Sequence, residues 1–253
     1  RVFEGENHDA RHYLERSGFS ASMIDRFFHP LFSGIFLEDD LRTNERMFRF
    51  VFRMMSKGDM ILPKDGIIAA PNQLAERLGS ERIHLNCNVN IVDLTTIEID
   101  GKTSSFDAVV RAFNTQQHLE KRHVWTLHFD AESSPLKTQH VLLNGDVKLH
   151  NGLIAHLAVP SDIQPTYAPP GRSLVTVTVV GERAKAAGYT DAASVEAAVR
   201  QELALWFPSS SPAWRLLATQ HIEHALPEVG SDCILEAAPR ISGFECGDHT
   251  LHG

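Results

Sequence analysis

The residues best suited to hold a ligand lie near the end of the chain, in the step Cys246-Gly247-Asp248. An apolar segment leads into this step, and a carboxylate just after a strand end can accept hydrogen bonds from ligand hydroxyl groups. Gly247 lets the backbone approach a ligand that a Cβ would keep away. A helix beginning after this step would present free N–H groups to a phosphate. The step therefore predicts contact with a sugar-phosphate chain. We expect the motif to continue beyond Gly253, so that the chain is a piece of a longer protein.

The fourteen histidines are the second group that could form a functional site, and their spacing decides whether they could bind a metal ion. His8 and His12 are four residues apart, and His221 and His224 flank Glu223 in an HxxH pattern. A zinc site needs a third and a fourth ligand, and the sequence has neither an HExxH motif nor a cysteine partner nearby. We therefore expect no metal, and histidines that lie on the surface or are hydrogen-bonded.

No Ser-His-Asp set or carboxylate pair stands out, so the sequence assigns no catalytic residue. Arg49 and Arg53 lie on a strongly apolar predicted helix. They could meet a substrate carboxylate, but ordinary salt bridges are the favoured interpretation.

Composition places the chain among ordinary globular proteins, with 253 residues, 43% hydrophobic and 22% charged. The formal net charge of −8 argues against a nucleic-acid surface, which needs a basic face. No apolar run reaches the ~18 residues of a membrane-spanning helix. The start at Arg1 has neither the apolar stretch of a signal peptide nor an initiator Met, so we expect sequence upstream. The chain has three cysteines, which are widely spaced: Cys87, Cys233 and Cys246. An odd number without close pairs favours reduced thiols in an intracellular protein that is not secreted.

The elements that position these residues begin with helices. The clearest helix spans Asn44 to Lys57, with Asn44 as its N-cap and Gly58 closing it. Gly34 is interpreted as a turn before it. The helix carries an apolar stripe, and core packing is the favoured interpretation, while the wall of a lipophilic substrate tunnel stays open. The stripe consists of Met47, Phe48, Phe50, Val51, Phe52, Met54 and Met55.

A period of two begins after a short predicted helix from Pro71 to Leu78. Strands are predicted around 83–85, 89–92 and 97–99, and Asp100-Gly101 is a strong hairpin signal. A last apolar strand at 106–110 is expected to be buried and to lead into a parallel sheet.

The second half predicts an antiparallel sheet with one wet face. Strands are expected between residues 118 and 181 and again at 216–221. A helix capped by Asp191 should run to Phe207 between them, and Ala225-Leu226-Pro227 should turn the chain toward the final motif.

Taken in order, these segments resemble the flavin-containing amine oxidoreductase superfamily. The nearest resemblance is to its carotenoid (phytoene) desaturase and protoporphyrinogen oxidase-like members. The segments that carry it are Phe27–Leu37, Phe48–Met54, Leu62–Gly66, Pro71–Ala75, Ile83–Val92, Ala225–Pro227 and Cys246–Asp248.

The resemblance implies FAD as cofactor. It also implies an α/β fold (α+β within this chain), in which a partial Rossmann-like FAD/NAD(P)-binding domain is interleaved with a substrate domain of antiparallel sheet and helices. Residues 71–117 and 231–253 would belong to the FAD-binding domain, and 1–70 and 118–230 to the substrate domain. Val89 would contact the adenine end through its main chain, and Gly247 and Asp248 the pyrophosphate and ribityl chain. No GxGxxG fingerprint occurs in the chain, so we expect it upstream.

The function that the resemblance implies is transfer of a hydride from a lipophilic or amine substrate to the flavin. A cytoplasmic or plastid location follows from the same resemblance. The expected partner is a small, hydrophobic molecule, and peripheral membrane contact stays open. The alternatives are a flavin-dependent isomerase, a non-catalytic relative, or a lipid- or pigment-binding module that the Phe- and Met-rich helices alone would indicate.

Overall fold

The computed structural model describes residues 8–113, 121–150, 152–228, 230 and 244–246. The chain forms two compact units: unit 1 comprises Arg1–Lys64 and Glu120–Cys233, and unit 2 comprises Asp65–Leu119 and Ile234–Gly253. The chain leaves unit 1 after Lys64, returns at Glu120 and leaves again after Cys233. The assignment of these regions to FAD binding and to substrate binding stays a prediction.

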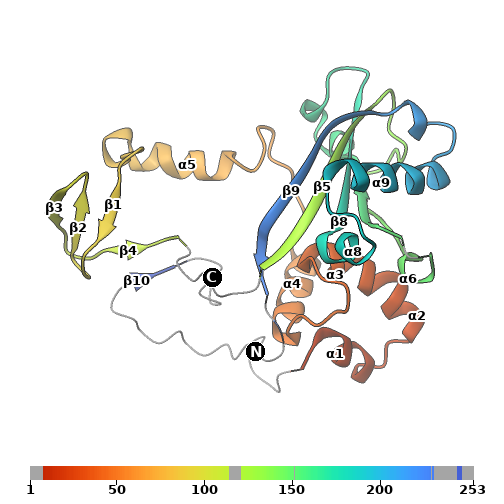
Figure 1. Cartoon of the computed structure of the whole chain (residues 1–253), viewed down its shortest axis with the longest axis horizontal. Coiled ribbons are helices and arrows are strands. Elements are labelled where there is room, and N and C mark those ends of the chain that lie inside the picture. The colour runs from red at the N-terminus through yellow and green to blue at the C-terminus, as the bar shows by residue number, and fades with distance from the viewer. Residues whose placement is uncertain (1–7, 114–120, 151, 229, 231–243, 247–253) are drawn as a thin grey trace. The chain divides into compact units, whose positions relative to one another are not determined.

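Unit 1 is built on a five-stranded antiparallel sheet in the order β6-β7-β8-β5-β9 (Figure 1). The strands are β5 (Lys121–Ala131), β6 (Leu142–Leu143), β7 (Ile154–Ala158), β8 (Ser173–Val180) and β9 (Arg215–Pro227). The antiparallel sheet predicted from the sequence is confirmed. The predicted turn at Ala225-Leu226-Pro227 is wrong, because these residues continue β9, and Pro227 lies opposite Lys121. Proline is tolerated there because it ends a strand at the edge of the sheet.

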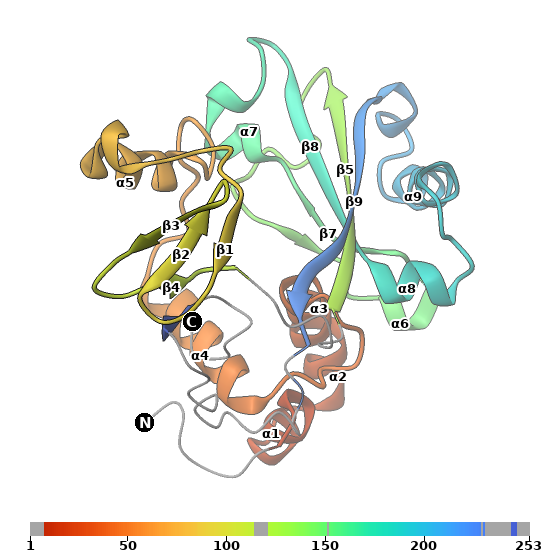
Figure 2. The same ribbon diagram turned by 60° about the vertical axis from the view of Figure 1, so that its left-hand side comes forward.

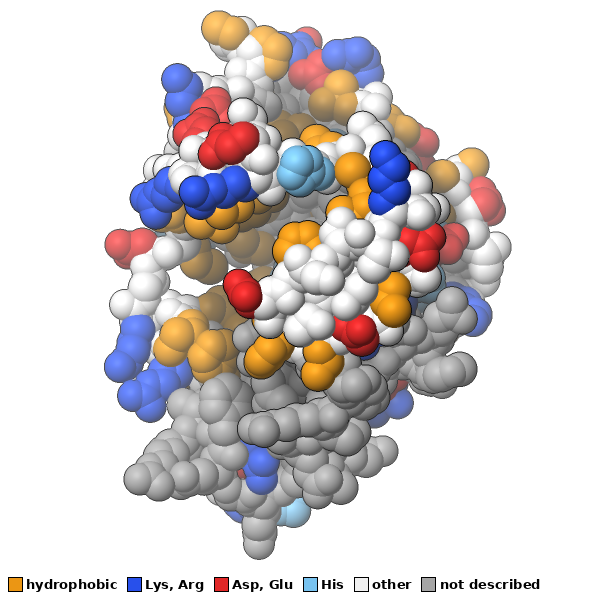
Figure 3. Space-filling view, turned by 90° about the vertical axis from the view of Figure 1, so that its left-hand side faces the viewer, with side chains coloured by type: hydrophobic (Ala, Val, Ile, Leu, Met, Phe, Trp, Pro, Cys, Tyr) orange, Lys and Arg blue, Asp and Glu red, His pale blue; other side chains and the backbone are white. Residues whose placement is uncertain are grey.

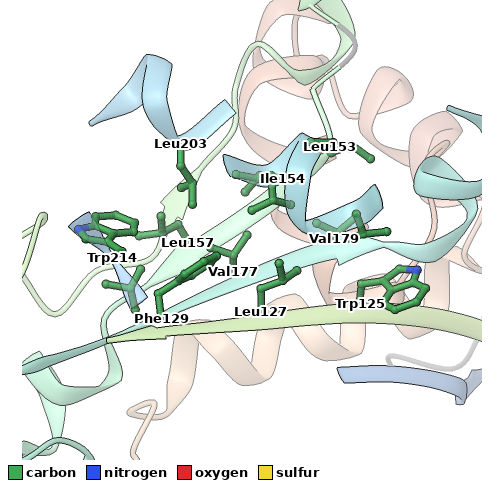
Figure 4. Close-up of a cluster of buried hydrophobic side chains, with 14 of the residues drawn as sticks. Trp125, Leu127, Phe129, Leu153, Ile154, Leu157, Val177, Val179, Leu203 and Trp214 are labelled. Carbon is green, nitrogen blue, oxygen red and sulfur yellow. The ribbon is translucent and has the colours of Figure 1, made fainter. Parts of the chain in front are cut away.

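One face of this sheet forms the main core. Trp125, Leu127 and Phe129 alternate along β5 and are 5%, 0% and 0% exposed, as the period of two requires for a strand that is buried on one face. Figure 4 shows them on the same side of the sheet as Leu203 of α9 (Ala192–Trp206). Asp191 caps α9 in a reciprocal capping box, so the predicted helix is confirmed.

Figure 2 shows α8 (Gly181–Ala186) and α9 on the same side of β5 and β9. Unit 1 also contains the short elements α6 (Val147–His150), α7 (Pro160–Ile163), η3 (Pro165–Tyr167) and η4 (Ser211–Ala213). Glu202 ties α9 to the sheet. Its carboxylate accepts from the main-chain N–H of Leu153 at 2.8 Å and of Ile154 at 3.1 Å, and from the Asn144 amide at 2.7 Å. Burial raises the pKa of Glu202 despite these hydrogen bonds.

Five helical segments form a second core within unit 1. They are α1 (Ala10–Arg16), α2 (Ala21–Met23), η1 (Ile24–Phe28), α3 (His29–Phe36) and α4 (Glu45–Lys57). Phe28, Phe32 and Phe48 are at most 2% exposed, and the ring centroids of Phe32 and Phe48 lie 4.4 Å apart. The Asn44 side chain accepts from the N–H of Arg46, which confirms the predicted N-cap of α4. The core interpretation of the aromatic stripe is therefore confirmed for Phe48.

The predicted turn at Gly34 is wrong, because α3 continues to Phe36. A Cβ at Gly34 would overlap the imidazole of His156 on β7. The Nε2 atom of His156 lies 2.7 Å from the carbonyl oxygen of Pro30 and 2.9 Å from that of Leu31. Since both partners are acceptors, Nε2 carries the hydrogen. Gly34 thus serves the close packing of α3 on β7 rather than a turn.

An ion pair between a buried arginine and a half-buried carboxylate joins the helical segments to the sheet region. Arg183 of α8 is 9% exposed, and its Nε lies 3.1 Å from Asp39 Oδ1. The Nε2 atom of His29 lies 3.2 Å from the same oxygen. Burial acts to raise the pKa of Asp39, but the hydrogen bonds from His29 and Arg183 outweigh it and lower the pKa to about 2. Asp39 is therefore ionised and holds α3 against α8.

A second polar contact fixes the chain between α3 and α4. Glu38 is fully buried, and its carboxylate accepts from the main-chain N–H of Arg42 at 3.1 Å and of Thr43 at 3.2 Å. Arg122 at the start of β5 donates to Thr43 Oγ1 at 3.0 Å and pairs with Glu228 at 3.8 Å. Buried charges are tolerated only when paired in this way.

Unit 2 has a simpler construction. It contains α5 (Ala69–Leu78), η2 (Ser80–Arg82), an antiparallel sheet β1-β2-β3 and a parallel pair β4-β10. The strands are β1 (Val89–Ile91), β2 (Thr96–Ile99), β3 (Lys102–Ser105), β4 (Val110–Arg111) and β10 (Phe244–Glu245). Asp100 and Gly101 have φ of 48° and 81°, which confirms the predicted hairpin.

Two strand predictions in unit 2 are wrong. Ile83 and Leu85 form no strand, since η2 precedes them and Asn86 follows with a φ of 58°. The segment 106–110 is not buried: Phe106 is 49% and Val110 59% exposed. Among the described strands β4 pairs only with β10, and the exposure of Val110 shows that no described layer covers its side chain. Figure 3 shows hydrophobic side chains interspersed with charged ones on the side of the molecule that carries α5 and the β1-β2-β3 sheet.

Candidate functional site

The parallel pair β4-β10 leads directly into the predicted ligand-binding step. Phe244 lies opposite Val110, and the N–H of Cys246 donates to the carbonyl of Arg111 at 3.0 Å. Cys246 therefore stands at the carboxyl end of two adjacent parallel strands, which is where open α/β sheets bind their ligands. Gly247 and Asp248 follow in the chain and lie outside the described residues, so their contacts stay a prediction.

Val89, the third predicted site residue, lies on the edge strand β1. The N–H of Asp100 donates to the carbonyl of Asn88 at 3.0 Å, so these two residues form a hydrogen-bonded pair. Hydrogen-bonded and non-hydrogen-bonded pairs alternate along antiparallel strands. The next pair, Val89 with Ile99, is therefore a non-hydrogen-bonded one. The N–H and C=O of Val89 consequently point away from β2, toward the side on which no described strand pairs with β1.

This arrangement suits a nucleotide base. An adenine presents an amino donor beside ring-nitrogen acceptors, and a main-chain N–H and C=O on a free strand edge are complementary to such a set. The side-chain carboxylate of Asp100 accepts from the N–H of Asn88 at 3.1 Å and so fixes the start of β1. The described part of the predicted FAD site thus offers donors and acceptors that fit the cofactor.

Sequence reasoning missed the place of Arg111. The structure sets it in β4, opposite Glu245 and bonded through its carbonyl to Cys246. A charged residue directly after the apolar run Val109-Val110 was the available signal. Its guanidinium is a suitable partner for anionic ligand groups such as phosphates.

Two histidines come together in unit 1 that the sequence did not pair. His123 Nδ1 lies 2.9 Å from His221 Nε2, and the His221 ring stacks on Trp125 with 4.0 Å between ring centroids. Burial, and then the charges of His221 and Lys185, lower the pKa of His123. Among residues whose placement is described, no three His, Cys, Asp or Glu side chains are grouped to hold a metal ion.

Arg49 and Arg53 have different surroundings. Arg49 pairs with Glu45 at 3.5 Å and lies over the Tyr13 ring, so the salt-bridge interpretation is confirmed for it. Arg53 is exposed on the outer side of α4.

Comparison with known proteins then decides the family. Residues 2–231 match the model of the flavin-containing amine oxidoreductases. The chain belongs to this family. FAD is the cofactor that membership indicates, and the predicted resemblance is confirmed at this level. Specific likeness to phytoene desaturases is not part of the match.

Several solved structures share the fold. An oxidoreductase from Methanosarcina mazei is similar with a TM-score of 0.70 at 16% identity, over 96% of this chain and 63% of that one. Putrescine oxidase bound to putrescine is similar with a TM-score of 0.65 at 13% sequence identity, over 95% of this chain and 62% of that one. Reduced UDP-galactopyranose mutase is similar with a TM-score of 0.59 at 13% sequence identity, over 91% of this chain and 59% of that one. These matches confirm the predicted α/β fold class, and the chain spans about three fifths of the length of each structure.

The search of curated proteins gave no match. Within the described residues, no helix is both long and apolar enough to span a membrane.

Proposed function

We propose that the whole protein is a FAD-dependent oxidoreductase that removes a hydride from an amine or lipophilic small molecule. The observation that carries this proposal is the family match over residues 2–231. FAD, when bound, supplies the hydride acceptor, so the protein need not contribute a nucleophile or an acid-base pair. The part of the chain is to bind and orient the cofactor and the substrate.

Three residues carry the proposed cofactor contacts. The free main-chain edge at Val89 supports a contact to adenine, and the parallel strands ending at Cys246 support a phosphate or ribityl contact by the residues that follow. Gly247 would admit the pyrophosphate close to the backbone, and Asp248 would accept hydrogen bonds from ribityl hydroxyl groups.

Two observations bear on the choice between amine and lipophilic substrates: family membership and the exposure of the apolar side chains of α4. Family membership favours an amine. The lipophilic proposal depended on α4 as a tunnel wall. Of its apolar stripe, Phe48 is 1% exposed and belongs to the core, while Phe50, Phe52 and Met54 are 36%, 39% and 45% exposed and still offer an apolar surface. We therefore place amines first and keep lipophilic compounds as the second class to test. Cys87 and Cys246, the cysteines among the described residues, are free thiols, which accords with a reducing compartment, for which we propose cytoplasm or plastid.

The test uses the full-length flavoprotein. We expect it to purify with the visible absorbance of oxidised flavin, and an amine substrate to bleach this absorbance without oxygen, with recovery in air. The Asp248→Ala variant should lose about tenfold or more in FAD affinity, because hydrogen bonds to a charged group contribute about 1.5–3 kcal/mol. Asp107→Ala, at an exposed carboxylate of unit 2, is the matched control and should bind FAD normally. A full-length protein that takes up no flavin would refute the proposal.

A flavin-dependent isomerase is the second candidate, because a UDP-galactopyranose mutase shares the fold with a TM-score of 0.59. An isomerase would convert its substrate without net consumption of an oxidant. Flavin that is bleached by substrate and restored by air, with oxidised product formed in equal amount, excludes it. Turnover with no oxygen consumption would favour it over the oxidoreductase.

A further inference from the structure

The outer face of α4 carries an exposed apolar side chain beside its cations, which a helix that only covers a core would not need. Its inner face carries Phe48 into the aromatic core. Its outer face would be polar throughout if the helix only covered that core. Instead Met54 is 45% exposed there, and the exposed cations Arg53 and Lys57 lie beside it at helical spacing.

The segment after α4 continues this surface. Met60 and Ile61 are 75% and 77% exposed, among the most exposed large hydrophobic side chains of the described chain. The end of the segment is held in place, since the Tyr167 hydroxyl donates to the carbonyl of Pro63 at 2.8 Å and Thr166 Oγ1 to that of Lys64 at 3.1 Å. These apolar side chains are therefore presented to the outside by an anchored backbone.

The local charge is opposite to that of the whole chain. Residues 45–64 contain five Arg and Lys and two Asp and Glu, whereas the chain has a net charge of −8. One of the two carboxylates, Glu45, is buried and pairs with Arg16 at 3.2 Å as well as with Arg49. The exposed charged side chains of this stretch are Arg53, Lys57 and Lys64 against Asp59, so cations outnumber carboxylates on the surface around Met54, Met60 and Ile61.

Exposed apolar side chains beside Arg and Lys, here on the last turns of α4 and on the non-helical segment that follows, suit a surface that lies on a membrane. The apolar side chains enter the boundary between headgroups and acyl chains, while the long cationic side chains reach outward to lipid phosphates. A local excess of cations on an acidic protein also orients this surface toward an anionic bilayer.

We propose that the outer face of α4 and the segment 58–64 form a docking surface for membranes containing anionic lipids. Met54, Met60 and Ile61 enter the headgroup region, and Arg53 and Lys57 pair with lipid phosphates. The proposal depends on neither the flavin nor the substrate.

The test is co-sedimentation of the full-length protein with vesicles of phosphatidylcholine alone or mixed with phosphatidylglycerol. We expect binding to the mixed vesicles that weakens as salt is added. Arg53→Glu with Lys57→Glu should reduce binding more than tenfold, because each cation near an anionic surface contributes about fivefold. Met60→Ser with Ile61→Ser should also reduce binding, while the remaining binding keeps its dependence on salt.

Matched controls separate this surface from general effects of charge and hydrophobicity. Arg77→Glu with Lys102→Glu reverses two exposed cations of unit 2, and Leu205→Ser removes a side chain of α9 that is 80% exposed. Both should bind vesicles like the unchanged protein, and far-UV circular dichroism should be the same for all variants. Absence of binding to anionic vesicles overturns the proposal. The proposal is also overturned if the control variants lose as much vesicle binding as the α4 variants, or if the α4 variants bind vesicles normally and differ only in self-association.

Discussion

The two units of this chain use hydrophobic residues in opposite ways. In unit 1, Leu127 and Phe129 are fully buried, and both cores of the described chain lie there. In unit 2, no described residue is buried, although Ile67 and Leu85 are as apolar as their counterparts and are 81% and 76% exposed. Strand and helix patterns alone therefore do not decide burial. What differs is whether a second layer packs on the face that they create.

This difference accords with the prediction that unit 2 contributes to cofactor binding while unit 1 carries the packed cores. Unit 1 has a packed sheet-helix core and paired buried charges, so contacts within the unit hold its fold. Unit 2 offers main-chain groups at a strand edge and at the ends of parallel strands, where Val89 and Cys246 lie. The first is suited to hold a shape and the second to meet a cofactor.

The sharpest test of this contrast removes one phenylalanine from each unit. Phe129→Ala should lower the free energy of unfolding by about 3–5 kcal/mol, because it leaves a cavity in a packed core. Phe106→Ala, at a side chain 49% exposed, should change it by less than about 1 kcal/mol. Urea unfolding followed by tryptophan fluorescence reports on unit 1, since Trp125, Trp206 and Trp214 all lie there. Far-UV circular dichroism follows both units. A large cost for Phe106→Ala would show that unit 2 has a core of its own.

Charged pairs should show the same contrast with a smaller effect. Arg183→Met leaves the Asp39 carboxylate without its main partner and should cost about 2–3 kcal/mol. This is less than the 3–5 kcal/mol of a fully buried pair, because Asp39 is 37% exposed. Arg82→Met breaks an exposed pair with Glu81 in unit 2 and should cost less than about 1 kcal/mol. Thermal unfolding of both variants provides the comparison, and equal shifts would contradict it.

The sequence predicted the elements of unit 1 because each has a strong local signal. Asp191 caps α9, Asn44 caps α4, and the alternation along β5 marks its buried face. The same reasoning failed at Gly34 and at 106–110, where the outcome depends on a contact far away in the sequence. The packing at Gly34 depends on His156 of β7, and the exposure of Val110 on its strand pairing, among the described strands, with β10 alone.

The candidate site was predictable only in part. The Asp100-Gly101 hairpin signal fixes the register that turns the main chain of Val89 outward. The sequence predicts a parallel sheet after 106–110 but not the partner strand, because β4 and β10 lie more than a hundred positions apart and no local pattern links them. Arg111 was therefore missed as a neighbour of the Cys246 step.

The edge of β1 gives a test confined to unit 2. Val89→Pro removes one N–H from the proposed adenine contact and should weaken FAD binding by the full-length protein by about 0.5–1.5 kcal/mol, the contribution of one hydrogen bond. Val89→Ala keeps the main chain and should bind FAD normally. Fluorescence titration of the apoprotein with FAD measures both. Equal loss in the two variants would indicate a side-chain contact instead.

The smallest effect concerns pH and is confined to unit 1. Burial lowers the pKa of His123, His128 and His156 below 6.5. The unfolded chain therefore binds more protons than the folded one as the pH falls below about 6.5, and the free energy of unfolding decreases. The contribution of these histidines is complete above that pH and is lost on acidification through their folded-state pKa values. Asp39, with a pKa of about 2 in the folded chain, loses its contribution only below the ordinary aspartate pKa of 3.8, outside this range.

His128 allows this effect to be isolated. Its Nδ1 lies 3.1 Å from Thr176 Oγ1, so His128→Gln keeps a hydrogen-bonding side chain at the site and removes the titrating group. The raised pKa of Glu202 acts in the opposite direction, because its contribution decreases as the pH rises. The informative quantity is therefore the difference between the two proteins. Urea midpoints from tryptophan fluorescence between about pH 7.5 and pH 5.5 should fall less for His128→Gln than for the unchanged protein. Parallel curves would show that His128 binds a proton equally well in the folded and unfolded chain, and would remove it from the set that makes unit 1 sensitive to acid.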